Sequence, residues 1–176
     1  MLAPFDNSYW VQSKLFLAGC YPGAPTPDLI PKRIAALLDA KIVSIISLME
    51  PCEIYADGRP YVPYDEDFLR AAHQRGIKAS WLNFPIPDYG VPDMAQMQSL
   101  IRQINENIAA ALPVYLHCWG GKGRTGTAVG CWLAHTGDPD PLATLTRLRK
   151  DCPNARQPSP ETEEQIKMVK NWPVGQ

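Results

Sequence analysis

The stretch from Val114 to Thr127, VYLHCWGGKGRTGT, constrains the fold more than any other part of the chain. Its apolar beginning predicts a short buried strand, and the i, i+3, i+4 spacing of Val129, Trp132 and Leu133 predicts a helix after it. The glycine-rich segment between them predicts a tight loop. A strand, such a loop and a helix N-terminus bring together unpaired backbone N–H groups and the positive end of the helix dipole. The stretch therefore predicts an anion-binding site.

One cysteine, Cys118, lies at the mouth of this loop. A thiol close to a helix N-terminus loses its proton more readily than a free thiol, and the thiolate is a strong nucleophile. The alternative interpretation is a buried structural cysteine beside a tight turn. The stretch thus predicts a reactive thiol next to a bound anion.

The segment HCWGGKGRTG resembles the signature loop of the cysteine-based protein tyrosine phosphatase superfamily, in its dual-specificity branch. That signature is histidine, cysteine, any five residues, arginine, and then serine or threonine. Here the specified positions are His117, Cys118, Arg124 and Thr125. The resemblance implies a phosphoric monoester hydrolase that acts through a phosphocysteine intermediate on Cys118. Its partners would be phosphorylated proteins or small phosphorylated substrates.

The rest of the chain alternates predicted strands with predicted helices. The run KIVSIISLM is β-branched and nearly continuously apolar, which is typical of a strand covered on both faces of a sheet. This alternation predicts one α/β domain over residues 1–176, with a largely parallel central sheet flanked by helices. The resemblance implies the same fold and covers about residues 14–172. Strands are predicted over residues 14–19, 41–49, 77–86 and 114–116, and helices over residues 26–40 and 65–74 and from the caps Asp93, Asp140 and Ser159.

Charge and hydropathy exclude several classes of protein. The formal net charge is −1, so we expect no nucleic-acid partner and no attraction to anionic membranes. The first ten residues have neither a basic flank nor an apolar signal core, and the longest apolar run, residues 42–49, is too short to span a bilayer. We therefore expect a cytoplasmic protein without integral membrane association. No pattern indicates the oligomeric state.

The five cysteines are irregularly spaced and form no CxxC pair, and the chain has only three histidines. We therefore expect neither a metal site nor a disulfide scaffold, and the resemblance implies no cofactor. For the cysteines outside the loop, packing is the main interpretation. One hypothesis is that Cys20, Cys52 or Cys131 traps oxidised Cys118 as a disulfide.

Hydrolysis of a phosphate monoester needs an anionic nucleophile, neutralisation of the phosphate oxygens and a proton for the leaving group. Cys118 suits the first task. The guanidinium of Arg124 suits the second, because a planar fork binds two phosphate oxygens at once. The glycines let the loop backbone turn its N–H groups towards the phosphate. The predicted substrate-binding residues are Trp119, Gly120, Gly121, Lys122, Gly123 and Arg124.

The third task needs a carboxylic acid on a loop that reaches the site. Asp88, in FPIPDYGVPD, follows a predicted strand, and α/β folds place their sites at such strand ends. The string is similar to the family's general-acid loop, although Ile86 stands where the classical tyrosine phosphatases carry tryptophan. In the second half-reaction the same carboxylate would act as the base on water. Asp93 is the alternative acid, and we interpret it as the cap of the next helix.

Three further residues resemble supporting positions of the family. Thr125 resembles the hydroxyl that hydrogen-bonds the thiolate, and the alternative is a helix N-cap. His117 resembles the residue that orders the loop by hydrogen bonding. Gln165 resembles the glutamine that positions water, but we favour its interpretation as a surface helix residue, and Gln157 has no better support.

The loop gives two indications about the substrate. Lys122 adds charge beside the pocket, as in phosphatases of phosphoinositides or inositol phosphates, whereas Trp119 offers apolar contact or stacking. We favour a phosphotyrosine or dual-specificity protein phosphatase, with phosphoinositides or inositol phosphates as the alternative substrates. Pocket depth decides whether a short phosphoserine or a long phosphotyrosine can reach Cys118, and we expect this depth to depend on how residues 50–64 fold over the site. Alternatives of another class are a phosphate-binding interaction module and a rhodanese-like sulfurtransferase.

Overall fold

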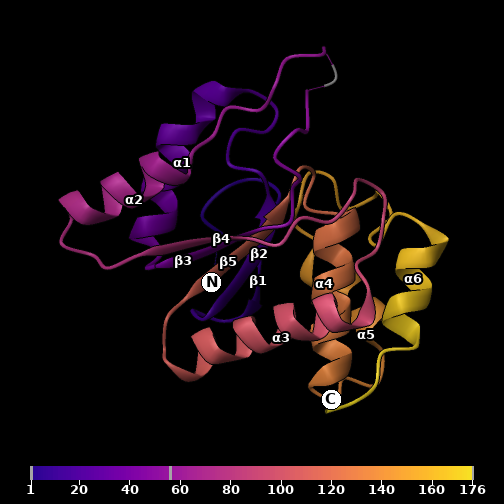
Figure 1. The fold of residues 1–176 in the computed structure, drawn as a ribbon. Helices are drawn as coiled ribbons and strands as arrows, with labels where there is room; N and C mark the ends of the chain where they lie inside the picture. Colours follow the sequence, from indigo (N-terminus) through magenta and orange to yellow (C-terminus); the bar gives the residue numbers. More distant parts are fainter. Residues whose placement is uncertain (1, 56, 176) are drawn as a thin grey trace.

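The computed structural model describes residues 2–55 and 57–175, in which a five-stranded sheet lies between two groups of helices (Figure 1). The strands are β1 (Ser8–Gln12), β2 (Phe16–Cys20), β3 (Ser44–Ser47), β4 (Ser80–Asn83) and β5 (Val114–Cys118). A short 3-10 helix, Pro27–Leu29, precedes α1 (Ile30–Asp39), and the other helices are α2 (Asp65–Gln74), α3 (Met94–Ala109), α4 (Gly123–His135), α5 (Pro141–Leu148) and α6 (Glu163–Lys170).

The strand order is β1-β2-β5-β3-β4, and every neighbouring pair is parallel except β1 with β2. The predicted α/β domain with a largely parallel sheet is therefore confirmed. The central strand is β5, which carries the signature cysteine at its end. In its register, Cys118 lies opposite Cys20 of β2, and His117 lies opposite Ser47 of β3. The antiparallel edge strand β1 was not predicted, because its sequence, SYWVQ, lacks the alternation of a half-buried strand.

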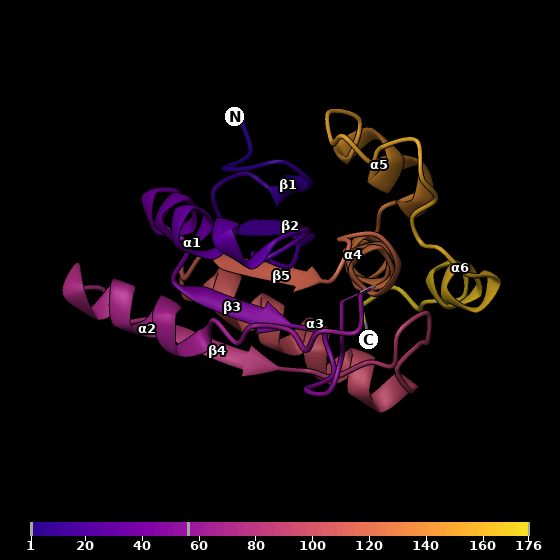
Figure 2. The ribbon, with the colours of Figure 1, turned by 90° about the horizontal axis from the view of Figure 1, so that it is seen from above.

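Two hydrophobic cores cover the two faces of the sheet. One contains Tyr115 of β5 and packs against α1 and α2, which lie together on one side of the sheet in Figure 2. The other contains Val114 and Leu116 of the same strand and packs against α3, α4, α5 and α6. Since successive residues of β5 face opposite cores, the strand is apolar throughout.

The strands predicted over residues 41–49 and 77–86 are much shorter in the structure, where they become β3 and β4. Ile42 and Leu48 flank β3 and are fully buried, although neither belongs to the strand. Apolar residues continue beyond the ends of a ladder because the core does, so hydropathy alone overestimates the length of a buried strand.

Two of the predicted helix caps are confirmed. The Asp93 carboxylate accepts a hydrogen bond from the Gln96 backbone N–H at the start of α3 (2.7 Å), and Asp140 accepts one from Ala143 at the start of α5 (3.1 Å). Each acceptor satisfies one of the unpaired N–H groups of a first helical turn.

The cap predicted at Ser159 is wrong, whereas Thr26 is the N-cap of the 3-10 turn, with Pro27 directly after it as predicted. Thr26 makes no side-chain cap, and the 3-10 turn separates it from α1. The Ser159 hydroxyl donates instead to the Lys122 carbonyl (2.9 Å), and the final helix is capped by Thr162. A hydroxyl before a proline is also common in turns. Here the Ser159 hydroxyl binds the signature loop instead of capping a helix.

Candidate active site

The signature loop joins the end of β5 to the start of α4, so residues 119–122 lie between the cysteine and the helix. Cys118 is the last residue of β5 and is only 3% exposed. It lines a hollow of about 400 Å³ at the carboxyl end of the parallel strands, where α/β folds place their sites. The strand, loop and helix predicted from this stretch are thereby confirmed.

The backbone of the loop is arranged for an anion. Within residues 2–55 and 57–175, the amides of Gly120, Gly121, Lys122 and Gly123 donate to no protein acceptor. Gly121 has a φ of +69°, and a Cβ there would lie 2.5 Å from the carbonyl carbon of Gly19. Only glycine allows this turn against the end of β2, which keeps the loop amides together at the N-terminus of α4.

Arg124 is almost fully buried and is held by a carboxylate that the sequence analysis missed. Both of its Nη atoms donate to Glu53, with Nη2 2.9 Å from Oε2, and Nη1 also donates to the Ile86 carbonyl (3.0 Å). Burial lowers the pKa of Arg124, but Glu53, Cys118 and Asp88 outweigh burial and raise it, so the guanidinium stays charged. Glu53 follows β3, and a carboxylate just beyond a parallel strand is the signal that could have found it.

Asp88 reaches the same hollow from the loop after β4. Its Oδ1 lies 3.0 Å from Arg124 Nη2, and its side chain is 56% exposed. The structure thus brings together Cys118 and Arg124 of the signature loop with Asp88 from a second segment, the loop after β4. Asp93 does not line this hollow, because its carboxylate caps α3.

The loop that carries Asp88 is fastened to α6. Gln165 Nε2 donates to the Gly90 carbonyl (2.9 Å), while its Oε1 accepts from the Glu161 backbone N–H (2.9 Å). Gln165 is fully buried, so the surface interpretation of this residue is wrong. The helical pattern did not reveal its burial, because the polar side chain is satisfied entirely by backbone groups of neighbouring segments.

His117 supports the loop from the interior of the sheet. Its Nδ1 lies 3.4 Å from the Cys118 carbonyl, and its Nε2 forms a hydrogen bond with the Tyr64 hydroxyl (2.5 Å), which also accepts from Trp81 Nε1 (3.3 Å). Burial lowers the pKa of His117 to about 3, so the ring is neutral at physiological pH. No sequence pattern linked Tyr64 and Trp81 to this histidine.

Thr125 is fully buried in the first turn of α4. Its hydroxyl donates to the Gly19 carbonyl of β2 (3.4 Å). The N-cap position belongs to Lys122, so the alternative interpretation of Thr125 as a cap is wrong. The contact ties the helix start to Gly19 of β2, the same residue that Gly121 approaches closely.

The Trp119 ring packs among three tyrosine rings, of which Tyr55 and Tyr61 come from the segment between β3 and α2. The Trp119 ring lies 4.9 Å from that of Tyr61, 5.0 Å from that of Tyr55 and 5.7 Å from that of Tyr21, measured between centroids. Trp119 lines the hollow together with Cys118. One wall of the site is therefore apolar and aromatic.

Lys122 also lines the hollow and is paired. Its Nζ lies 2.8 Å from Glu161 Oε1 and donates to Gln157 Oε1 at 2.6 Å. Gln157 therefore contacts the phosphate loop through Lys122. The loop also receives a hydrogen bond from Asn154 Nδ2 to the Gly120 carbonyl (3.1 Å).

All five cysteines are free thiols in the structure. Cys20 is buried and lies opposite Cys118 on the neighbouring strand, whereas Cys52 is exposed in the loop after β3. Cys131 is buried within α4, where burial raises its pKa. Register thus distinguishes Cys20 from the other candidates.

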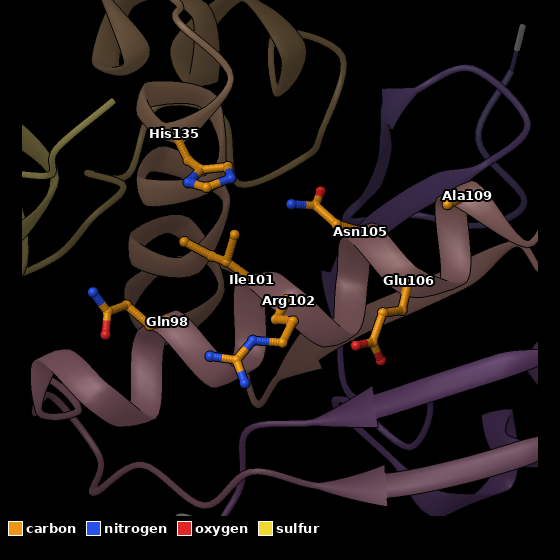
Figure 3. A pocket seen from close by; sticks show the side chains of 7 residues that line it. All are labelled: Gln98, Ile101, Arg102, Asn105, Glu106, Ala109 and His135. Carbon is orange, nitrogen blue, oxygen red and sulfur yellow. The ribbon is translucent and has the colours of Figure 1, made fainter. Parts of the chain in front are cut away.

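A larger hollow, of about 530 Å³, lies between α3 and the end of α4 (Figure 3). Arg102, Glu106 and His135 contribute to its lining, and it shares no residue with the hollow at Cys118. It is therefore separate from the candidate active site. Among the residues that the structure describes, no group of three or more His, Cys, Asp or Glu side chains could hold a metal ion, and no helix is long and apolar enough to cross a membrane.

An α/β fold with a cysteine in an amide-lined loop, followed by an arginine, defines the class of cysteine-based phosphatases. Residues 25–175 match the family model of the Swiss Army Knife protein DSP-PTPase phosphatase domain, and the chain belongs to this family of cysteine-based phosphatases. The resemblance seen in the signature loop is thereby confirmed.

Curated relatives support the same family. A putative tyrosine phosphatase of Invertebrate iridescent virus 3 is 28% identical over 142 residues, which is 78% of this chain and 50% of the viral protein. An uncharacterised protein of Methanocaldococcus jannaschii is 30% identical over 96 residues, which is 54% of this chain and 61% of that protein. The chain thus spans about half of the length of the curated relatives that it matches.

Solved structures share the fold. Tk-PTP in its active form has a TM-score of 0.70 at 22% identity, with coverage of 94% of this chain and 95% of that one. PTPMT1 in complex with PI(5)P has a TM-score of 0.66 at 17% identity (95% and 94% coverage). The core catalytic domain of the PP-IP phosphatase SIW14 from S. cerevisiae also has a TM-score of 0.66, at 15% identity (98% and 88% coverage). PTPMT1 is seen with PI(5)P and SIW14 is a PP-IP phosphatase, so the shared fold does not select one substrate.

Proposed function

We propose that this protein hydrolyses phosphate monoesters through a covalent intermediate on Cys118. The thiolate attacks phosphorus, an S–P bond forms, and the P–O bond to the leaving group breaks. The free amides of residues 120–123 and the Arg124 guanidinium would bind the phosphate oxygens and stabilise the transition state. The observation that carries this proposal is the meeting of Cys118 and Arg124 with Asp88 in one hollow, although Asp88 comes from a separate part of the chain.

Asp88 is proposed to act as the general acid and then as the general base. It would donate its proton to the departing oxygen, and its carboxylate would then accept a proton from the water that attacks the S–P bond. Its position beside Arg124 and its exposure to solvent support both roles, because the acid must reach the leaving group and water must reach the acid. Hydrolysis releases inorganic phosphate and regenerates the Cys118 thiolate.

The supporting residues have narrower proposed roles. His117 would hold the Cys118 carbonyl, and with it the strand end, from the interior. Thr125 would serve the thiolate after a small rotation from its contact with Gly19. Gln165 would place the Asp88 loop through its contact with Gly90, rather than position water. Trp119 would contact the substrate next to the phosphate.

We propose phosphotyrosine-bearing or mixed-specificity phosphoproteins as the substrates. The Trp119 ring supports this proposal, because it lines the hollow beside Cys118, is held by packing against Tyr55 and Tyr61, and offers apolar surface for a phenyl ring. The alternative, a phosphoinositide or inositol phosphate, finds support in the likeness to PTPMT1 with PI(5)P. It requires free positive charge beyond Arg124, and Lys122 is already paired.

Turnover of phosphotyrosine peptides by Cys118→Ser and Asp88→Ala proteins tests the mechanism. Cys118→Ser should lose at least about 10³-fold in kcat, because a serine hydroxyl is not ionised at neutral pH, yet it should still bind a phosphopeptide. Asp88→Ala should lose about 10²- to 10³-fold on phosphotyrosine and far less on p-nitrophenyl phosphate, whose leaving group needs no proton.

Two matched variants serve as controls. Cys52→Ser removes an exposed thiol outside the hollow, and Asp93→Ala removes a carboxylate that caps α3. Both should retain the leaving-group preference of the wild type. Full activity in the Cys118→Ser protein, or equal losses on both substrates for Asp88→Ala, would contradict the proposed mechanism.

A further inference from the structure

Lys122, the one lysine of the signature loop, is paired with side chains from another segment. Lys122 Nζ lies 2.8 Å from the Glu161 carboxylate and donates to the Gln157 side chain at 2.6 Å. The side chains of Lys122 and Glu161 are 20% and 21% exposed, so this ion pair is partly shielded from solvent. All three residues line the hollow that contains Cys118.

The segment that supplies these partners is itself held in place. It runs between α5 and α6, and the buried Arg149 donates to Asn154 Oδ1 (3.0 Å) and to the Gln157 carbonyl (3.4 Å). Asn154 in turn donates to the Gly120 carbonyl, and Ser159 donates to the Lys122 carbonyl. The segment is therefore bound to the phosphate loop by several contacts, so Glu161 stays near Lys122.

The charges around the hollow are consequently balanced. Its charged lining residues are two cations, Arg124 and Lys122, and two carboxylates, Asp88 and Glu161. Arg124 is also paired with Glu53. A single phosphate would find Arg124 and the loop amides. A second phosphate beside it would meet a lysine whose charge is already neutralised, and it would be repelled by the Glu161 carboxylate.

We infer that Glu161 and Gln157 determine specificity, because they hold the Lys122 ammonium away from the substrate's anions. The site then prefers one phosphate on an uncharged, aromatic carrier to substrates with neighbouring phosphates. This inference rests on the proposed function, since it concerns the substrate class of the same site. Glu161 acts here through Lys122 and through its own charge, and it touches no reacting atom.

The test uses two synthetic peptides of identical sequence, one with a single phosphotyrosine and one with an additional phosphoserine beside it. Their dissociation constants are measured by calorimetry on full-length Cys118→Ser protein, so that no turnover is needed. Adding Glu161→Gln should strengthen binding of the doubly phosphorylated peptide, relative to the singly phosphorylated one, by about five- to ten-fold. This gain should shrink at high ionic strength.

Three controls separate charge from shape. Glu161→Asp keeps the charge and should keep the original preference. Gln157→Ala removes the neutral partner without altering charge and should change the preference less than Glu161→Gln does. Combining Glu161→Gln with Lys122→Met removes the released cation and should return the preference to that of the parent protein.

An unchanged preference in a folded Glu161→Gln protein would overturn the inference, and so would an equal gain in the Glu161→Asp protein. Thermal unfolding identifies any variant that has lost its fold. If Glu161→Gln is such a variant, the relative affinity of Gln157→Ala for the two peptides is the measurement that tests the inference. Failure of the proposed function is a different result, because it would be seen as absence of wild-type turnover on the singly phosphorylated peptide.

Discussion

At the scale of single residues, Cys20 and Cys118 are direct partners across the parallel strands β2 and β5. Neighbouring strands lie about 4.8 Å apart and paired side chains share a face, which is within the Cα separation that a disulfide accepts. Burial raises the pKa of Cys20 to about 11, against a lowering influence from Arg33, so Cys20 is a neutral thiol at physiological pH. The sequence-based hypothesis of a trapping cysteine is thereby narrowed to Cys20.

We expect Cys20 to protect Cys118 when the protein is exposed to a stoichiometric hydroperoxide such as hydrogen peroxide. The Cys118 thiolate is oxidised to a sulfenic acid while the peroxide O–O bond breaks and hydroxide leaves. The Cys20 thiol then displaces water from that sulfur as the disulfide forms. Wild-type activity should return after treatment with dithiothreitol, whereas most of the activity of Cys20→Ser should not, because its Cys118 proceeds to irreversible acids.

Peptide mass mapping after peroxide treatment checks the linkage directly. A bridge between Cys20 and Cys118 should be found in the wild type and in the matched Cys52→Ser control. Equal recovery in the wild type and in Cys20→Ser would show that Cys20 plays no protective part.

At the scale of elements, the loop of residues 87–92 is positioned by α6. Gln165 binds the Gly90 carbonyl, and the Thr162 hydroxyl donates to the Tyr89 carbonyl at 3.4 Å. The Gly90 amide donates back to the Pro87 carbonyl at 2.8 Å, which closes the loop on itself. The loop that carries Asp88 is thus held by a helix that lies far away in sequence.

We predict that Gln165→Ala lowers kcat for a phosphotyrosine peptide by about ten-fold and destabilises the fold by about 1–3 kcal/mol, because buried backbone groups lose their partner. The loss should be much smaller for p-nitrophenyl phosphate. In an Asp88→Ala background the same substitution should have little further effect on kcat, which a double-mutant cycle measures.

Gln98→Ala, at the separate hollow between α3 and α4, is the matched control. It should leave kcat and the free energy of unfolding near those of the wild type. If Gln165→Ala slowed both substrates equally, and did so in the Asp88→Ala background as well, Gln165 would act independently of the acid loop.

At the scale of the whole molecule, the central strand β5 carries a buried neutral histidine between the two cores. The pKa of His117 falls from its ordinary value of 6.5 to about 3 in the folded protein because burial disfavours the charged ring. Below pH 6.5 the unfolded chain binds a proton that the folded protein does not. Acid therefore stabilises the unfolded chain relative to the fold. The neutral His117 contributes fully to the free energy of unfolding above about pH 6.5, and this contribution is lost as the pH falls towards 3.

Denaturant titrations between pH 7 and pH 4 measure this contribution. The free energy of unfolding of the wild type should fall more steeply with acid than that of His117→Gln, by about 1.4 kcal/mol per pH unit between pH 6 and pH 4. His73→Asn, which alters an exposed histidine of α2, should keep the wild-type slope. Parallel slopes for the wild type and His117→Gln would show that His117 is protonated in the fold.

Local chemistry explains why the sequence predicted so much of the site. Cys118, the glycines and Arg124 lie within one short stretch, so their spacing along the chain already defines a strand, an amide-lined loop and a helix start. Asp88 could be predicted from the sequence for a similar reason, because it follows a strand and lies in a recognisable loop. Continuous apolarity in the strands indicated a sheet covered on both faces.

The tertiary structure decided which side chains surround that loop. Glu53 on Arg124, Tyr64 on His117, Gln165 on the acid loop and Glu161 on Lys122 all lie distant in sequence from the residues that they contact. Such pairs depend on how the two helical layers and residues 50–64 close over the sheet, and no local pattern encodes that closure. The sequence therefore predicted the residues of the proposed reaction centre, whereas the fold alone set how their charges are balanced, because electrostatic balance is a property of neighbours in space.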